Sequence, residues 1–301
     1  MAAAPALSVV VACLSAPEVL ARCAAALRLH VGVRSAEVLF IGRWENAAPT
    51  FTDVQLLYPE FSWIGAPDAA TVPELRALGA ARSRGQTIAL IEDDCVVQAG
   101  WFEALSRPIT PPVGAVGGAI EPGDYATGLD WAVYLCEYGR FGLPLEPGEG
   151  TYLPGNNVAY ARDVLNRFLS SSPAASLNET AAHEWLRSSG YTLLRNPEML
   201  VRNVNRWGFA NIAKVPYHHG RSYAARQAAG RGFMVGASRA ALTLALPLVF
   251  ASRVAGRAAE KGRLRTFFTA LPFITLFVLS WSAGEAMGNL WGPGKSESKW
   301  R

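Results

Sequence analysis

The first 130 residues alternate short apolar runs with segments in which apolar residues recur at helical spacing. The apolar runs are rich in β-branched residues and predict buried strands, whereas the alanine- and leucine-rich segments predict helices. Strands are expected at Leu7–Cys13, Ala36–Ile41, Thr87–Ile91 and Val113–Ile120, with helices at Pro17–Leu29, Pro73–Arg84 and Trp101–Leu105. Such alternation is typical of parallel strands joined by crossover helices, so an α/β fold is predicted.

The pattern weakens over Glu121–Pro154, where glycine, proline and aromatic residues are frequent. We expect irregular structure that lines a site there, because loops often carry functional residues. Further along, Asp163–Phe168 and Glu179–Ser189 predict helices, and Tyr191–Leu194 predicts a short strand.

The last 70 residues change character and predict an apolar helical pair, which separates a domain at 1–230 from a membrane-associated region at 231–301. Thirteen uncharged residues follow Arg239, about 20 Å as a helix, and 19 follow Arg265, about 28 Å. Only the second segment is long enough to cross a hydrocarbon core of about 30 Å. Five basic residues in the connection at 253–265 favour the cytoplasmic side, so the first helix is expected to be interfacial or re-entrant.

Three tryptophans are candidate anchors at the membrane interface: Trp281, Trp291 and Trp300. A buried helical hairpin within a soluble domain is the alternative interpretation of the same segment.

Composition and charge support contact with lipid rather than with nucleic acid. Half of the 301 residues are hydrophobic and 17% are charged, which is unusually apolar for a freely soluble chain. Residues 1–230 carry 18 basic and 21 acidic groups, whereas residues 231–301 carry 10 and 3. The basic excess therefore lies in the apolar region, as is typical of attraction to a membrane surface. The four cysteines form no CxxC pair, which indicates neither a zinc site nor a disulfide framework.

Three acidic residues, Glu92, Asp93 and Asp94, follow the strand expected at Thr87–Ile91. Open α/β sheets bind ligands beyond the carboxyl ends of their strands, and carboxylate oxygens suit hard divalent cations. A solvated acidic turn is the plain structural alternative.

The segment Leu75–Val97 resembles the family 2 glycosyltransferases of the GT-A fold. Their Ala-Arg-Asn-x-Gly stretch, a second glycine six residues later and a strand that ends in an Asp-x-Asp motif align here without a gap. The resemblance implies a mostly parallel sheet flanked by helices. It also implies that Glu92 and Asp94 bind Mg²⁺ or Mn²⁺, and that Arg76 and Asp93 lie near the donor phosphates.

Two further segments match the same family. Leu153–Leu165 matches its Gly-x-Asn-hydrophobic-Ala-aromatic-x-Arg stretch, which implies that Gly155, Asn156 and Asn157 face the transferred sugar and the acceptor. An Asn-rich turn before a helix is the structural alternative.

The segment Asn178–Tyr191 matches the family's helix that opens with an acidic pair and ends in Arg-x-x-Gly-Tyr, which implies that Glu179 is the general base. The alternative is a capping box in which Ser176 caps the helix and Glu179 occupies its third position.

His219 and Arg221 precede the apolar region, where they could meet the diphosphate or a lipid phosphate, or form a solvated basic turn. The aspartate with which family members end their second strand is absent from Phe40–Glu45, so the nucleobase is left open. The processive Gln-x-x-Arg-Trp motif is also absent, which favours single sugar additions.

Together these features predict a metal-dependent, inverting glycosyltransferase of the hexosyltransferase type. A nucleotide-sugar donor is expected, with a UDP-sugar as the first choice, together with a lipid-linked or membrane-proximal glycan acceptor, as in polysaccharide biosynthesis. The expected location is the cytoplasmic face of the inner membrane. A GT-A-fold membrane adaptor that has lost its activity is the alternative, since Glu92 replaces the commoner aspartate and Asn178 replaces an acid.

Overall fold

The computed structural model describes residues 5–31, 36–44, 49–125, 127–171, 176–230, 233–296 and 299. Glu45 and Trp300, which the sequence singled out, lie outside these residues. The chain divides into two compact units, one comprising residues 1–123 and 141–205 and the other residues 124–140 and 206–301.

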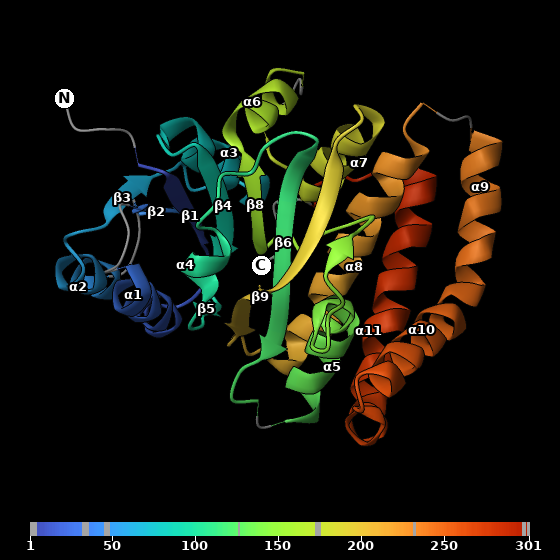
Figure 1. The fold of residues 1–301 in the computed structure, drawn as a ribbon. Coiled ribbons are helices and arrows are strands. Elements are labelled where there is room, and N and C mark those ends of the chain that lie inside the picture. Colours follow the sequence, from blue (N-terminus) through green and yellow to red (C-terminus); the bar gives the residue numbers. More distant parts are fainter. Residues whose placement is uncertain are drawn as a thin grey trace. The chain divides into compact units, whose positions relative to one another are not determined.

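The first unit is built on a central sheet in the order β3-β2-β1-β4-β8-β6-β9-β5, with β7 paired to β9 (Figure 1). The strands are β1 (Leu7–Cys13), β2 (Ala36–Gly42), β3 (Ser62–Gly65), β4 (Thr87–Glu92), β5 (Cys95–Val97), β6 (Val113–Pro122), β7 (Gly148–Glu149), β8 (Asn157–Ala161) and β9 (Thr192–Asn203). β3, β2, β1 and β4 run parallel, as their crossover helices predict. β8 lies antiparallel between β4 and β6, so the sheet as a whole is mixed.

Both faces of β1 and β4 are buried, as continuous apolar runs require. Val10 and Ala12 of β1 belong to a core shared with α3 (Val72–Arg82), α6 (Arg162–Ser171) and α7 (Glu179–Ser188). Val9 and Val11 are fully buried on the opposite side of the same strand. The remaining helices of this unit are α1 (Pro17–Val31), α2 (Pro49–Leu57) and α4 (Trp101–Ala104).

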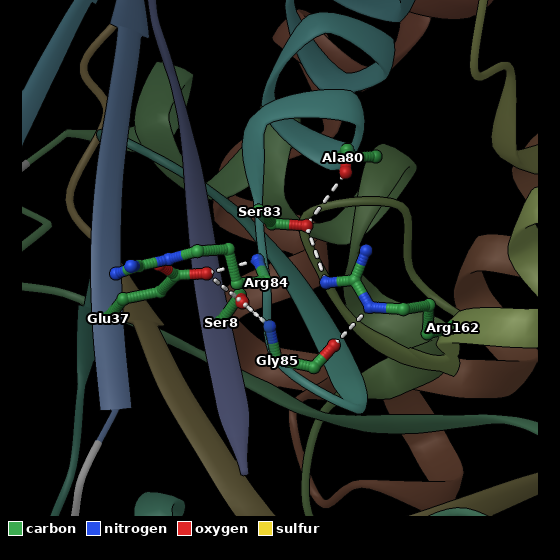
Figure 2. Close-up of polar contacts among 7 residues, drawn as sticks. All are labelled: Ser8, Glu37, Ala80, Ser83, Arg84, Gly85 and Arg162. Atoms are coloured by element: carbon green, nitrogen blue, oxygen red, sulfur yellow. Dashed lines mark hydrogen bonds and ion pairs between the residues drawn. The ribbon is translucent and has the colours of Figure 1, made fainter. Parts of the chain in front are cut away.

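A glycine turn fixes the start of β4 beside β1. The Gly85 amide donates to Ser8 Oγ at 2.6 Å, and Ser8 Oγ donates in turn to Glu37 at 2.6 Å. A Cβ on Gly85 would lie 2.5 Å from the Ser8 amide nitrogen, so only glycine allows this approach. On the other side, Arg162 donates to the Gly85 carbonyl and to Ser83 Oγ, and these bonds join the α3–β4 turn to α6 (Figure 2).

The second unit is helical and consists of α5 (Gly128–Glu137), α8 (Phe209–Ala228), α9 (Phe233–Leu242), α10 (Leu246–Glu260) and α11 (Leu264–Trp291). α9 and α10 are joined by a 3₁₀ turn at Thr243–Ala245, and α11 packs against each of the other four helices (Figure 1). Two helical stretches, Met234–Glu260 and Leu264–Trp291, are long and apolar enough to cross a membrane. Length and composition alone are weak evidence for a span, because helices in soluble cores pass the same test.

Candidate active site

The site is centred on a buried guanidinium that joins two carboxylates from different elements. Arg76 on α3 donates from Nη2 to Glu92 Oε1 at 2.8 Å and from Nη1 to Glu179 Oε2 at 2.7 Å. Glu92 ends β4, and Glu179 begins α7. Arg76 and Glu92 are buried, whereas the Glu179 side chain is 30% exposed. The three residues therefore run from the end of the sheet toward solvent.

Local packing brings these residues together. Gly79 on α3 lies so close to β1 that a Cβ there would come within 2.2 Å of Val10 Cγ1, which sets the helix, and with it Arg76, against the sheet. The Leu177 amide donates to the Pro73 carbonyl at 2.8 Å and ties the start of α7 to the start of α3. Both glycines of the matched motif, Gly79 and Gly85, thus serve packing.

Glu179 does not form the capping box that the sequence offered as an alternative. Asn178 is the N-cap of α7, and its Oδ1 accepts from the Ala181 amide at 3.1 Å. Glu179 is consequently the first residue of the helix, and its carboxylate turns to Arg76. The helix start leaves this carboxylate in a region of positive potential.

Charge within the cluster favours the ionised carboxylate. Burial by itself disfavours ionisation of Glu179, but the Arg76 guanidinium outweighs burial and holds the pKa of Glu179 below its usual value. The Glu179 and Glu92 carboxylates raise the pKa of Arg76, although burial of the guanidinium acts to lower it. Glu179 is therefore ionised at neutral pH, as a general base must be.

Gly155 lies beside this cluster, and Asn156 follows it in the chain. A Cβ on Gly155 would approach Glu179 Cδ to 2.8 Å, so glycine makes room for that carboxylate. Two buried donors in this region, Asn156 Nδ2 and Arg76 Nε, have no hydrogen-bond partner among the described residues. Buried donors without a partner are costly, and a bound ligand rich in oxygen acceptors would satisfy them.

Two candidate ligand-binding residues have structural partners instead. Asp93 accepts from the Leu14 and Ser15 amides at 2.8 and 2.7 Å and so fixes the β1–α1 turn. Asn157 is fully buried, and its Nδ2 donates to the Ala119 and Met199 carbonyls at 2.9 and 2.7 Å. Both N–H groups of Asn157 are used inside the sheet, which leaves none to donate to a sugar hydroxyl.

Asp94 and Glu92 are the candidate metal ligands, and both are buried. Asp94 accepts from the Cys95 thiol at 3.4 Å, and Glu92 binds Arg76. Within the described residues no group of three or more His, Cys, Asp or Glu side chains is placed to hold a metal. Mg²⁺ and Mn²⁺ in nucleotide enzymes are commonly held by one or two carboxylates together with substrate phosphates, and this pair fits that donor set.

His219 and Arg221 belong to the second unit, on α8. Arg221 Nε donates to the Gly292 carbonyl at 2.9 Å, beyond the end of α11, where a cation stabilises the helix C-terminus. His219 Nδ1 lies 3.5 Å from Glu137 Oε1 of α5. These contacts hold helices of that unit together.

Sequence reasoning missed a buried pair next to Glu179. Tyr160 on β8 and His183 on α7 are fully buried, with the Tyr160 oxygen 3.0 Å from His183 Nε2. Burial raises the pKa of Tyr160, with Glu179 acting in the same direction. The available signal was the helical spacing of Glu179 and His183, which puts both side chains on one face of α7.

Comparisons with known proteins support the fold. No protein-family model and no curated protein sequence matches the chain. Among solved structures it is similar to the mannosyltransferase PcManGT from Pyrobaculum calidifontis in complex with GDP-mannose and Mn²⁺. The two share 16% identity over 96% of this chain and 88% of that one, with a TM-score of 0.59. The α/β fold with its sheet, flanking helices and C-terminal apolar helices is therefore glycosyltransferase-like, as predicted.

Proposed function

We propose that the chain is an inverting glycosyltransferase, a hexosyltransferase of family 2 type, that moves a sugar from a nucleoside-diphosphate donor to a glycan acceptor at a membrane. One observation carries the proposal: the buried Arg76 joins Glu92, at the carboxyl end of β4, to the partly exposed Glu179. Charge buried at a strand end, where α/β sheets bind ligands, is a feature that functional sites share.

The reaction follows from the roles these residues can take. Glu179 accepts the proton of an acceptor hydroxyl while that oxygen attacks the anomeric carbon. The bond from that carbon to the diphosphate oxygen breaks, and the bonding electrons leave with the nucleoside diphosphate. Arg76 and the Asn156 amide offer N–H donors to the phosphate and sugar oxygens, and the fixed positive charge of Arg76 opposes the charge that develops on the leaving group.

A divalent cation, Mg²⁺ or Mn²⁺, would be held by Glu92 and Asp94 and would neutralise the diphosphate. Because Arg76 also pairs with Glu92, we expect donor phosphates to compete with that carboxylate for the guanidinium.

UDP- and GDP-sugars are the two donor classes to test first. The absence of an aspartate at the end of β2 leaves UDP open, and the GDP-mannose bound by the similar structure makes a GDP-sugar equally testable. The acceptor is a lipid-linked or membrane-proximal glycan, and residues 231–301 attach the chain to the cytoplasmic face of the inner membrane. The apolar stretches of the second unit support this attachment.

The test is donor turnover by the full-length protein in detergent, with UDP- and GDP-sugars and Mn²⁺ or Mg²⁺. Glu179→Gln should lower kcat by about 100-fold or more, because it removes a general base, with donor affinity within about threefold of wild type. Glu184→Gln, an exposed carboxylate on the same helix, is the matched control.

Asp94→Asn should abolish metal-dependent nucleotide binding by calorimetry. A folded wild-type protein that binds no nucleotide with either metal would overturn the proposal and favour an inactive adaptor. Equal turnover by Glu179→Gln and Glu184→Gln would remove Glu179 from the role of base.

A further inference from the structure

Over α9, α10 and α11 the helical unit has large apolar side chains on its exterior as well as in its interior. The exposed apolar side chains include Leu244 of the 3₁₀ turn at 85%, Leu248 of α10 at 79% and Phe268 of α11 at 64%. On α11 four of the exposed large apolar residues, Leu264, Phe268, Leu271 and Leu279, follow one helical stripe, whereas the terminal Trp291 lies on the opposite face. The buried face of α11 is also mainly apolar, with Phe267, Ile274 and Phe277, and it includes one polar contact in which Arg239 of α9 donates to Asn289 Oδ1 at 3.2 Å. Exposed apolar surface of this kind marks a site of contact with a membrane or with another protein.

One side of α11 nevertheless packs along its length against helices that are too polar for the hydrocarbon core. Its first half packs against α5, where a Cβ on Gly128 would come within 3.3 Å of the Phe273 ring and the Thr269 carbonyl. The Arg263 guanidinium at the start of α11 lies 5.3 Å from the Tyr134 ring centroid. Asp130 and Glu137 make α5 itself a poor candidate for the hydrocarbon core.

The second half of α11 packs against α8 through small residues. Cβ atoms on Gly284 and Gly288 would approach the carbonyl oxygens of Tyr217 and Arg221 to 2.0 and 2.2 Å. Both contacts advance by four residues, so the two helices run side by side in the same direction. α8 carries five basic or histidine residues, Lys214, His218, His219, Arg221 and Arg226. Each full charge at a bilayer centre costs about 3 kcal/mol or more, so α8 cannot accompany α11 across a membrane.

Chain connectivity likewise indicates that α5 does not cross a membrane. The 17-residue segment Asp124–Arg140 leaves the sheet unit and returns to it. Two crossings of a core of about 30 Å would need about 40 helical residues. The first half of α11, which packs on α5, therefore stays on the same side of the membrane as the sheet unit.

The apolar stretch before α11 is also unsuited to a span. Met234–Glu260 is mostly exposed, as a membrane span would be. Three arginines nevertheless interrupt its apolar sequence: Arg239, Arg253 and Arg257. The uncharged part, residues 240–252, is about 20 Å long as a helix and falls short of the hydrocarbon core.

We propose that α9, α10 and α11 form a monotopic anchor, which lies in one leaflet of an anionic bilayer with its exposed apolar stripe among the acyl chains and crosses the membrane nowhere. Exposed basic residues at the rim, Arg253 and Arg265, meet the anionic headgroups, and residues 231–301 carry 10 basic against 3 acidic groups. This inference rests on the membrane attachment proposed above but not on the transferase chemistry.

Vesicle binding tests the surface. Full-length protein, diluted from detergent, should bind vesicles of phosphatidylcholine with 30% phosphatidylglycerol at least tenfold more tightly than pure phosphatidylcholine. Leu248→Asp with Phe268→Asp should weaken that binding at least tenfold. Leu29→Asp, an equally exposed leucine on α1 of the sheet unit, should leave it unchanged. Equal binding by all three proteins, or no preference for anionic lipid, would overturn the proposal.

Sidedness separates a monotopic anchor from a spanning hairpin. Glu260→Cys, near the end of α10, and Ser170→Cys, on α6, are labelled with an impermeant maleimide in sealed vesicles; the four native cysteines are buried. A monotopic anchor predicts that both residues are labelled from the same side of the vesicle. Labelling of Glu260→Cys only after permeabilisation, with Ser170→Cys labelled before it, would show a span.

Donor hydrolysis in detergent is measured in parallel on every variant. Intact hydrolysis with lost vesicle binding would support the anchor. Absent hydrolysis in a wild-type protein that still binds vesicles would count against the proposed function alone.

Discussion

Arg76 is the charged side chain at the centre of the candidate site. It is buried and pairs with two carboxylates, one of which, Glu92, is also buried. Removing the cation would leave Glu92 charged in a poorly solvated place, and the penalty for an uncompensated buried charge exceeds the value of the pair itself.

We therefore expect Arg76→Met to lower the free energy of unfolding by about 3–5 kcal/mol. Adding Glu92→Gln to that variant should recover part of the loss, because the double variant buries no lone charge at this position. Urea unfolding of the two single variants and the double variant measures the coupling. Additive losses would mean that the two groups do not interact.

The four cysteines are buried and take no part in the proposed reaction. Cys13, Cys23, Cys95 and Cys136 are all buried and unpaired as thiols. Burial raises the pKa of each thiol, and the nearby carboxylates of Asp93, Asp94 or Glu137 act in the same direction.

The native protein should accordingly react with a thiol reagent such as DTNB at less than about 1% of the rate of the urea-unfolded protein at pH 8, since only the thiolate attacks. The absorbance of the released thiolate follows the reaction. Rapid release of one equivalent from the folded protein would contradict the placement of at least one cysteine.

At the scale of elements, the hydrophobic pattern predicts β1, β2 and β4, which are mainly apolar runs, but misses β3, whose four residues are at most partly buried. The expected strand at Tyr191–Leu194 proves to be the 12-residue β9. Pro197 and the polar residues around it obscured the pattern, and the register of β9 shifts against β6 at this point. α5 was missed inside the region expected to be irregular, because the glycine and proline residues before and after it interrupt the helical pattern. Its capping box, Thr127 and Asp130, was the readable signal.

The residues of the candidate site could likewise be predicted only in part from the sequence. The motif spacing located Arg76, Glu92 and Glu179, which the fold brings into contact. It could not distinguish them from Asp93 and Asn157, whose polar atoms are used by the β1–α1 turn and by the sheet. Hydrogen-bond partners that are distant in sequence decide between these roles, and a local pattern does not contain them.

Gly85 makes an element-scale prediction. Gly85→Ala should destabilise the sheet unit by about 3 kcal/mol or more, because the new Cβ would meet the backbone of Leu7 and Ser8 at 2.6 and 2.5 Å. Gly65→Ala is the control, since its nearest neighbour would be Trp44 at 3.8 Å. Thermal unfolding compares the two. Similar midpoints would contradict the close approach of β1 to the α3–β4 turn.

At the scale of the molecule, the two compact units are interleaved along the chain, since residues 124–140 belong to the helical unit and lie between two parts of the sheet unit. The domain boundary that the sequence predicts at residue 230 marks a change in amino-acid composition, whereas the two compact units reflect which residues pack together. Ligands for the two units are also expected to differ, with nucleotide for one and lipid for the other.

Hydrogen exchange should separate these responses. A nucleoside diphosphate with Mn²⁺ should slow exchange in α3, the end of β4 and the start of α7, whereas anionic vesicles should slow it in α9, α10 and α11. Mass spectrometry of peptides from the native protein reads both effects. Protection of α9–α11 by nucleotide alone, with none near Glu179, would contradict the assignment of the donor site.

The interleaving also has a consequence for synthesis on the ribosome. The 126 residues between the end of α5 and the start of α11 take roughly 6–25 seconds to synthesise at 5–20 residues per second. During that time the apolar face of α5, with Trp131 and Tyr134, has left the ribosome while the helix that covers it has not been made. A nascent chain of this protein therefore needs a chaperone or a nearby membrane before its last helix emerges.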